Sequence, residues 1–282
     1  MHDLDETRRT VMQVGLYDLF DSGLRTLAEG ALVETPPRLR EAIRYALLSG
    51  GSRWRPTLLL HVALACGIED LAPAMPAAYA LEMLHAASLV HDDLPCFDGA
   101  SLRRGLPSVH ARYGESTAVL VGDALIVLAF ETMAKTGGGD SILALARAAG
   151  PSRGLIAGQG WELEQSANLD DYHRAKTSAL FVAATTLGAR AAGAHPEDWY
   201  ALGETIGLAF QAADDLRDLA PPERTGKSSH RDAALGRRHE HDVLRERAFE
   251  QRAVLHRALR LRLDDLEIIR DFALRQAGAR EI

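Results

Sequence analysis

The sequence is poor in the features that mark secreted, membrane-spanning or nucleic-acid-binding proteins. Its 282 residues include two cysteines, Cys66 and Cys96, which are too few for a disulfide framework and fit a reducing compartment. The net charge is −7 and no basic block is present, which argues against a nucleic-acid surface. The charged N-terminus lacks the apolar segment of a signal peptide. No uncharged apolar run reaches about eighteen residues. We therefore expect a cytoplasmic protein without a membrane span.

Alternating runs of β-branched residues are also scarce, so a protein built on β-sheets is improbable from this sequence. Alanine and leucine are abundant instead, and apolar residues recur with helical spacing or cover nearly every face. The segments with this pattern are 38–48, 56–66, 74–91, 116–134, 142–164, 171–192 and 199–219. Glycine and proline clusters such as Gly50-Gly51 and Gly150-Pro151 break the pattern.

These segments predict an all-α protein with roughly ten or more helices. No linker and no repeat of fixed period is visible, so we expect one domain over residues 1–282. Residues 238–282 mix charge with periodic apolar positions, and we expect amphipathic helices there that close a large helical bundle.

Two acidic groups stand near the ends of apolar helical segments. Their members are Asp92, Asp93, Asp98, Asp214, Asp215 and Asp218. Asp214 and Asp218 are four residues apart and share one helical face, whereas Pro95 and Gly99 would have to loosen the helix to bring Asp98 round. Solvated helix ends or salt bridges would explain either group alone. Two such groups favour carboxylate clusters that bind Mg²⁺, and no Cys/His spacing indicates zinc.

Basic residues accompany these acids. They are Arg53, Arg55, Arg103, Arg104, Lys176, Lys227 and Arg237. Mg²⁺ held by a few carboxylates usually bridges to phosphate, and phosphate recognition also uses arginine and lysine. The segment GGSR is not a Walker loop, because it lacks the GK[ST] ending and a preceding strand. A lone lysine is usually an exposed side chain, but Lys176 precedes Thr177 and an apolar segment, which favours a cavity. The pattern predicts binding of a diphosphate joined to a hydrocarbon.

The ordered motifs resemble those of the trans-isoprenyl diphosphate synthases over about residues 40–240. The matching segments are GGSRWRP, HDDLPCFDGASLRRGLPSVH, VGDALIVLAFE, GQGWELE, KTSALF, FQAADDLRD and TGKSSHRDAALGR. In detail they are most similar to bacterial geranylgeranyl diphosphate synthases of carotenoid and bacteriochlorophyll pathways. The resemblance implies an isoprenoid-synthase helical bundle with a central apolar cavity, a homodimer and Mg²⁺, with about three ions when substrate is bound.

The resemblance also implies roles for single residues. Mg²⁺ would be bound by Asp92, Asp98 and Asp214, with Asp93, Asp215 and Asp218 beside them and Gln159 and Glu162 as outer-shell partners. The allylic diphosphate would be held by Arg103, Lys176 and Lys227, and isopentenyl diphosphate by Arg55, His85 and Arg104. Two further substrate-binding bases would be Arg53 and Arg237. The developing carbocation would face Thr177 and Gln211, with Phe210 lining the site.

The implied reaction condenses isopentenyl diphosphate head-to-tail with dimethylallyl, geranyl or farnesyl diphosphate to give geranylgeranyl diphosphate. Mg²⁺ and the bases would neutralise the leaving diphosphate, and apolar walls would keep water from the cation. One helical turn rises about 5.4 Å, close to one isoprene unit. The small Ala87 and Ser88, one turn before Asp92, leave room for the tail, and Met83 and Leu84 would stop it one turn further. This favours a C20 product over C15, although small residues would also suit helix packing.

The sequence departs from the family pattern at three places, two of which favour a non-catalytic subunit. Ser52 replaces the usual lysine, so one ion pair to isopentenyl diphosphate is missing unless Arg53 or another base supplies it. Gly99-Ala100-Ser101 replaces acids, whereas Arg237 replaces a lysine and keeps its charge. The alternatives are a farnesyl diphosphate synthase, a class I terpene cyclase, and a non-catalytic subunit. The bases of GGSRWRP and Arg104 argue against a cyclase, and the intact aspartates argue against a non-catalytic subunit.

Overall fold

The computed structural model describes residues 3–135, 138–164 and 168–218; the side chains of residues 3–14, 169 and 212–218 are not described. Backbone contacts group the chain into two compact units. The first unit comprises residues 1–145 and 187–194, and the second comprises residues 146–186 and 195–282. A single domain over residues 1–282 therefore stays a prediction, and the predicted helices in 238–282 lie outside the described residues.

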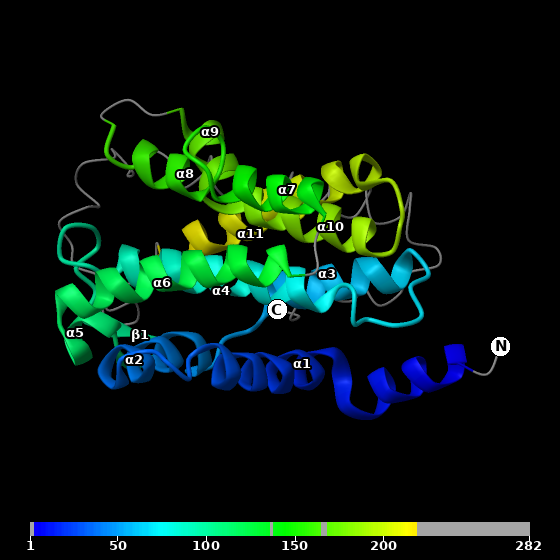
Figure 1. Ribbon diagram of the computed structural model, residues 1–282. Helices are drawn as coiled ribbons and strands as arrows, with labels where there is room; N and C mark the ends of the chain where they lie inside the picture. The colour runs from blue at the N-terminus through cyan, green and yellow to red at the C-terminus, as the bar shows by residue number, and fades with distance from the viewer. Residues whose placement is uncertain (1–2, 136–137, 165–167, 219–282) are drawn as a thin grey trace, which may run out of the picture. The chain divides into compact units, whose positions relative to one another are not determined.

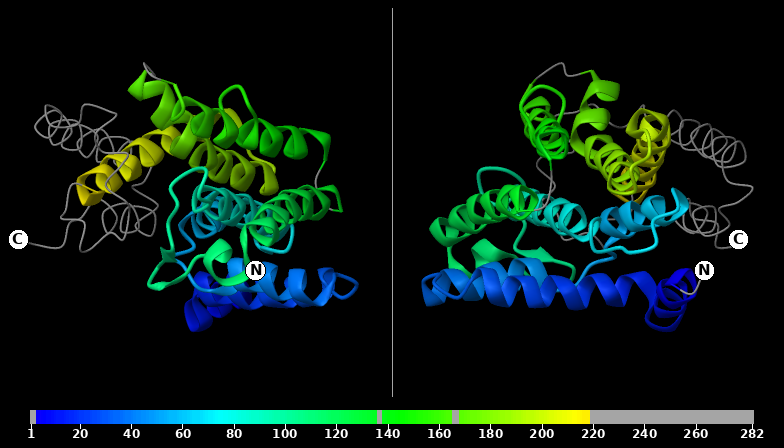
Figure 2. Two further views of the ribbon diagram at one scale, coloured as in Figure 1. Left: turned by 90° about the vertical axis from the view of Figure 1, so that its left-hand side faces the viewer. Right: turned by 45° about the vertical axis from the view of Figure 1, so that its right-hand side comes forward.

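The first unit is built around one buried helix. Its elements are α1 (Asp3–Ala31), α2 (Pro37–Leu48), α3 (Trp54–Ala65), α4 (Met75–Asp92), α5 (Val109–Tyr113) and α6 (Glu115–Ala134). The helix α4 packs along α6 and also contacts α1, α2 and α3, as Figures 1 and 2 show. This burial on several sides explains why its sequence is apolar nearly all round.

The helix α1 extends the fold beyond the segments that the sequence pattern indicated, which began at residue 38. It bends at Gly15, whose φ of 76° is not helical, and the break is visible in Figure 1. After the bend, Leu16, Phe20, Leu24 and Ala28 recur every fourth residue and are all buried. This apolar stripe lies on the face of α1 that packs against the other helices of the first unit.

A small hairpin interrupts the helices of the first unit. The strands β1 (Leu102–Arg103) and β2 (Leu106–Pro107) pair antiparallel, with Arg103 opposite Leu106. The two turn residues, Arg104 and Gly105, both have positive φ, 56° and 77°, as a type I′ turn requires. The Tyr45 hydroxyl holds the hairpin by donating to the Pro107 carbonyl at 2.6 Å. Strands this short show no alternating pattern, so the sequence did not indicate them.

The second unit contains a π-helix. Its elements are α8 (Leu155–Trp161), α9 (Leu169–His173), the π-helix η1 (Arg174–Ser178), the 3₁₀ helix η2 (Pro196–Trp199) and α11 (Tyr200–Asp218). The helices α8, α9 and α11 all contact η1. The helices α7 (Gly139–Ala149) and α10 (Ala179–Ala191) include residues of both units. The segments expected over 142–164 and 171–192 are thus interrupted, the first at Gly150-Pro151 and the second by η1.

One described helix, α6, is long and apolar enough to cross a membrane. Core helices of soluble proteins pass the same test of length and composition. The sequence contains no long uncharged apolar run because Asp123 and Glu131 interrupt this segment. The absence of a membrane span therefore stays a prediction.

Candidate active site

The first acidic motif lies where α4 ends and the chain turns back on itself. The backbone N–H of Asp98 donates to the carbonyl of Asp92 at 2.9 Å, and Gly99 N–H donates to Leu94 at 3.0 Å. The turn is completed by Gly99, which has a φ of 61°. The expected loosening of the helix around Pro95 and Gly99 is confirmed, because Asp98 returns to Asp92 although six residues separate them.

Asp93 differs from Asp92 and Asp98 because its side chain is almost fully buried, at 3% exposure. The Arg103 guanidinium donates to both oxygens of this carboxylate through Nε, at 3.1 and 3.2 Å, and also through Nη2. Burial raises the pKa of Asp93, and the hydrogen bond from Arg103 opposes the rise. The pair joins the acidic turn to strand β1, so both residues have a structural contact in addition to the metal and diphosphate roles expected of them.

A second feature of the first unit is a concentration of positive charge around His85. Burial lowers the pKa of this histidine well below its usual value, and the charges of four arginines lower it further. These arginines are Arg55, Arg104, Arg103 and Arg53. The imidazole is therefore neutral at pH 7. Two of the arginines, Arg53 and Arg103, are paired with acids, so Arg55 and Arg104 are the better candidates for attracting an anion to this region.

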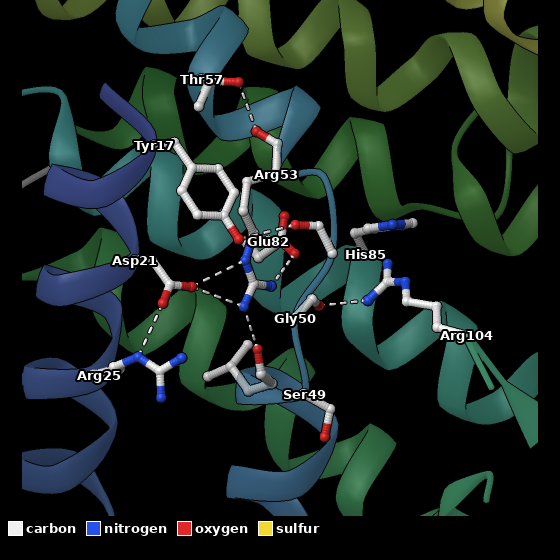
Figure 3. A network of polar contacts seen from close by, with 12 residues as sticks. Tyr17, Asp21, Arg25, Ser49, Gly50, Arg53, Thr57, Glu82, His85 and Arg104 are labelled. Carbon is white, nitrogen blue, oxygen red and sulfur yellow. Dashed lines mark hydrogen bonds and ion pairs between the residues drawn. The ribbon is translucent and has the colours of Figure 1, made fainter. Parts of the chain in front are cut away.

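Arg53 occupies a different position from the other three arginines. Its side chain is 2% exposed, and Nη1 donates to Glu82 at 2.5 Å. Nη2 donates to Asp21 at 3.1 Å and to the Leu47 carbonyl at 2.8 Å (Figure 3). These contacts favour a structural role for Arg53 over the substrate contact expected of it, and they weaken the idea that it replaces the lysine missing at Ser52.

Arg104 lies against the glycine pair that precedes Arg53. Its Nη1 donates to the Gly50 carbonyl at 2.6 Å, and a Cβ on Gly51 would meet that nitrogen at 2.7 Å. Burial lowers the pKa of Arg104, but the group stays charged at pH 7. Among the described non-glycine residues, the two with positive φ are Arg53 and Arg104. Backbone strain of this kind often marks a functional site.

The proposed chain-length residues lie on α4. Met83, Leu84 and Ala87 are each 1% exposed, and Ser88 is half-buried, with its hydroxyl bonded to the His85 carbonyl at 2.9 Å. Their role in product length stays a prediction.

Gly122 explains part of the VGDALIVLAFE motif. A Cβ at Gly122 on α6 would overlap the imidazole of His91, the residue that precedes Asp92. The same imidazole lies 3.9 Å from Asp123 and 3.4 Å from the Val119 carbonyl. Gly122 thus leaves space for the ring of His91, directly before the acidic turn, and Asp123 lies beside that ring.

The segment Gly99-Ala100-Ser101, where the resemblance to the family is thinnest, has structural contacts. The Ala100 carbonyl lies 3.0 Å from His110 Nε2, and the Ser101 carbonyl accepts from Ser108 N–H at 2.9 Å. This segment begins the hairpin that presents Arg103 and Arg104.

In the second unit, the π-helix presents Lys176 and Thr177 to side chains from the C-terminal end of α8, from α9 and from α11. Lys176 Nζ and the Tyr172 hydroxyl both donate to Glu162 Oε1. Lys176 also lies over the Tyr172 ring, 5.6 Å from its centroid. The structure thus brings together Lys176 and Glu162, two residues that the sequence had assigned to neighbouring roles.

The neighbouring contacts in this unit involve the other expected residues. The Thr177 hydroxyl donates to Gln211 Oε1, and the Phe210 ring packs on Phe181 with centroids 5.3 Å apart. Gln159 Nε2 is buried and has no hydrogen-bond partner within the described part of the chain. The N–H groups of Gln159 Nε2 could donate hydrogen bonds to an acceptor supplied by substrate or water.

Several expected site residues lie at or beyond the limit of the described structure. The backbone of α11 includes Asp214, Asp215 and Asp218, whose side chains are not described, and Lys227 and Arg237 lie outside the described residues. In the described part of the chain, no three His, Cys, Asp or Glu side chains form a metal-binding group. Two close carboxylate residues, Asp92 and Asp98, nevertheless suit Mg²⁺, which commonly takes one or two protein carboxylates and completes its shell with phosphate and water.

Three residues that contact the site were not identified from the sequence, namely Tyr17, Asp21 and Glu82. The signal for Glu82 was available, because it is an acid within the apolar segment 74–91 and is only 3% exposed. Tyr17 and Asp21 precede the first segment that the apolar pattern indicated, so that pattern could not relate them to the site.

Comparison with known proteins shows the family to which the chain belongs. The family model for polyprenyl synthetase matches residues 36–265. A geranylgeranyl diphosphate synthase of Cereibacter sphaeroides is 52% identical over 213 residues, covering 73% of this chain and 74% of the relative. One from Rhodobacter capsulatus is 49% identical, covering 75% of each.

Solved structures give the same result for the fold. A geranyltranstransferase from Thermotoga maritima has a TM-score of 0.76 at 27% identity, covering 92% of this chain and 97% of that one. An FPP/GFPP synthase from Zymomonas mobilis also has a TM-score of 0.76, at 30% identity, covering 98% and 100%. The chain belongs to the polyprenyl synthetase family and has the fold of its prenyltransferases.

Proposed function

We propose that this protein is an isoprenyl diphosphate synthase that makes geranylgeranyl diphosphate. The observation that carries the proposal is the cluster of Arg55, His85 and Arg104 beside the loop of residues 50–53. This cluster lies in the same unit as the acidic turn. Two relatives with about half of their residues identical carry the name geranylgeranyl diphosphate synthase. The reaction joins isopentenyl diphosphate to an allylic diphosphate and releases diphosphate.

The acidic turn would hold Mg²⁺ through Asp92 and Asp98, and the second acidic motif would hold it through Asp214, Asp215 and Asp218, for about three ions with substrate bound. When bound, the metal would neutralise charge on the leaving diphosphate. Gln159 and Glu162 would serve as outer-shell partners. The short backbone link between Asp98 and Asp92, 2.9 Å, supports the first half of this assignment.

The basic residues would divide between two diphosphates. Arg55, His85 and Arg104 would bind isopentenyl diphosphate, with His85 donating a hydrogen bond as a neutral imidazole. Arg103, Lys176 and Lys227 would bind the allylic diphosphate, and Arg237 would add charge. A guanidinium that already contacts an acid, as Arg103 contacts Asp93, is held in one orientation before substrate arrives.

The carbon chemistry follows from these positions. Once the allylic C–O bond breaks, its electron pair leaves with diphosphate, and the isopentenyl double bond attacks the cation. A proton then leaves the adduct, and the departed diphosphate is the acceptor that we propose. Thr177 and Gln211 would place oxygen dipoles towards the cation, with Phe210 shielding it from water.

The product length would be set on α4, where Ala87 and Ser88 leave room and Met83 and Leu84 limit it. A farnesyl diphosphate synthase is the second candidate, because structural relatives with a TM-score of 0.76 carry the names geranyltranstransferase and FPP/GFPP synthase.

We further propose that the enzyme is a homodimer in the cytoplasm, without a membrane span. The apolar side chains of Val119, Leu120 and Val127 on α6 are exposed, and a second copy would cover them. Sedimentation should give twice the monomer mass. Val127→Glu should shift the protein to monomer, whereas a wild-type monomer would contradict this part of the proposal.

The activity is tested by incubating the purified chain with Mg²⁺, labelled isopentenyl diphosphate and each allylic diphosphate in turn. We expect a C20 product that disappears when Asp92 is changed to Asn. A C15 product would favour the second candidate, and a cyclised hydrocarbon from the allylic substrate alone would favour a cyclase. An absence of any product would contradict the proposal.

A further inference from the structure

The N-terminal helix reaches the loop that precedes α3. Two side chains of α1 make this contact, and they lie four residues apart on one helical face. The Tyr17 hydroxyl donates to the Gly51 carbonyl at 3.2 Å, and Asp21 Oδ1 accepts from Arg53 Nη2 at 3.1 Å and Nε at 3.3 Å. Figure 3 shows both side chains directed at the loop from the same helix.

The loop conformation is one that the backbone alone would not favour. Gly50, Gly51 and Arg53 all have positive φ, 87°, 137° and 49°. Arginine seldom adopts such a φ, so the surrounding contacts must hold it there. Glu82 and Asp21 supply those contacts, because they pair with a guanidinium that is 2% exposed.

The same loop contacts one base that would bind isopentenyl diphosphate and leads directly into the helix that carries another. The Gly50 carbonyl accepts from Arg104, and the bare Cα of Gly51 lies against the Arg104 guanidinium. Arg55 follows Arg53 by two residues in the first turn of α3. A shift of the loop would therefore move Arg55 and Arg104 together, and Ser52 offers no lysine in this loop to compensate.

We propose that Tyr17 and Asp21 are positioning residues for the isopentenyl diphosphate subsite, acting through the loop of residues 50–53 without touching substrate. This inference rests on the proposed function of Arg55 and Arg104. Loss of either α1 contact weakens the binding of isopentenyl diphosphate and leaves the allylic diphosphate unaffected.

The test compares Tyr17→Phe and Asp21→Asn with wild type. Phenylalanine removes one hydroxyl and keeps the ring, so we expect KM for isopentenyl diphosphate to rise about fivefold. Asparagine removes the charge that Arg53 contacts, so a rise of about tenfold or more is expected. For both variants, kcat and the allylic KM should stay within about twofold of wild type.

The matched control is Asp18→Asn, which makes the same chemical change on the exposed face of the same helix. It should leave both KM values unchanged. Thermal unfolding followed by circular dichroism checks that each variant is folded. If Asp21→Asn does not fold, Tyr17→Phe still tests the inference.

Binding measured by calorimetry with isopentenyl diphosphate separates this inference from the proposed function. A wild-type chain that binds isopentenyl diphosphate but elongates nothing would overturn the proposed function alone. The inference is overturned if wild type does not bind isopentenyl diphosphate. It is also overturned if Tyr17→Phe binds isopentenyl diphosphate with the same affinity as wild type. An equal rise in both KM values, or a fall in kcat alone, would also overturn it.

Discussion

A side chain at Gly158 would overlap the backbone of Lys176, so α8 touches the π-helix where only a hydrogen atom fits. Gly207 makes the same kind of contact from α11, because its Cβ would overlap Ser178. Single-turn π-helices are frequent at functional sites. Here the two glycines flank the residues Lys176 and Thr177.

Gly158→Ala is expected to push α8 away from the π-helix and displace Lys176. Small displacements of binding groups are costly in catalysis, so kcat should fall by about tenfold or more. Gly160→Ala is the matched control, because that position in the same helix has open space around it. The control should keep wild-type kcat, and its stability should rise by up to about 1 kcal/mol. Equal kcat values for the two variants would contradict the prediction.

Glu82→Gln should destabilise the first unit, because the buried Arg53 guanidinium loses its closest carboxylate. Breaking a buried ion pair typically costs about 3–5 kcal/mol, and we expect the lower end since Asp21 remains. Urea denaturation measures this change. The control, Glu29→Gln, removes one partner of the exposed pair with Arg44, and its effect should stay within about 0.5 kcal/mol. A similar small effect for Glu82→Gln would show that the pair contributes little.

His85 should make stability depend on pH. Its pKa in the folded protein lies well below its usual value, because burial and four arginines disfavour the charged form. Below about pH 6.5 the unfolded chain therefore binds more protons, and the free energy of unfolding falls with falling pH by at most about 1.4 kcal/mol per pH unit. The His85→Gln variant should lack this part of the pH dependence of the free energy of unfolding.

Urea denaturation between pH 7.5 and 5.5 checks this prediction. The difference between wild type and His85→Gln isolates the histidine, because the carboxylates titrate in both proteins. A difference that does not change with pH would contradict it.

Ser52→Lys should add the ion pair to isopentenyl diphosphate that the resemblance to the family implies at this position. We expect KM for this substrate to fall by about fivefold, with the allylic KM unchanged. Steady-state kinetics with Ser52→Ala as the control separates the added charge from the lost hydroxyl. An unchanged KM in the lysine variant would indicate that another base already makes this contact.

Ala87→Tyr is expected to shorten the product, because an aromatic ring one turn before Asp92 would fill the space proposed for the tail. Chromatography of the products should show C15 or shorter chains in place of C20. Ser88→Ala, a change between small residues on the same helix, should leave the length unaltered. A C20 product from the tyrosine variant would place the end of the cavity elsewhere.

The main helices were predictable because buried helices carry apolar residues with helical spacing, and this pattern is visible in the sequence. The segments 38–48, 56–66, 74–91 and 116–134 match α2, α3, α4 and α6 to within two residues at each end. The return of Asp98 to Asp92 was also predictable, because Pro95 and Gly99 are local signals.

Other features depend on contacts between distant residues, which a local pattern does not contain. The burial of Arg53 depends on Glu82 and Asp21, which are 29 and 32 residues away. The π-helix at Arg174–Ser178 depends on packing against two glycines, and its own sequence resembles an ordinary helix. The hairpin was too short to show a period.

The turn between β1 and β2 has a consequence for any attempt to make this protein more heat-resistant. Its first position, Arg104, has a φ of 56°, where backbone energetics prefer asparagine or glycine. A library selected only for survival at high temperature would tend to replace this arginine, at the loss of its bond to Gly50. Such selections should therefore screen for turnover at every round, because the positions that relieve the backbone include Arg104, which we propose as a substrate-binding residue.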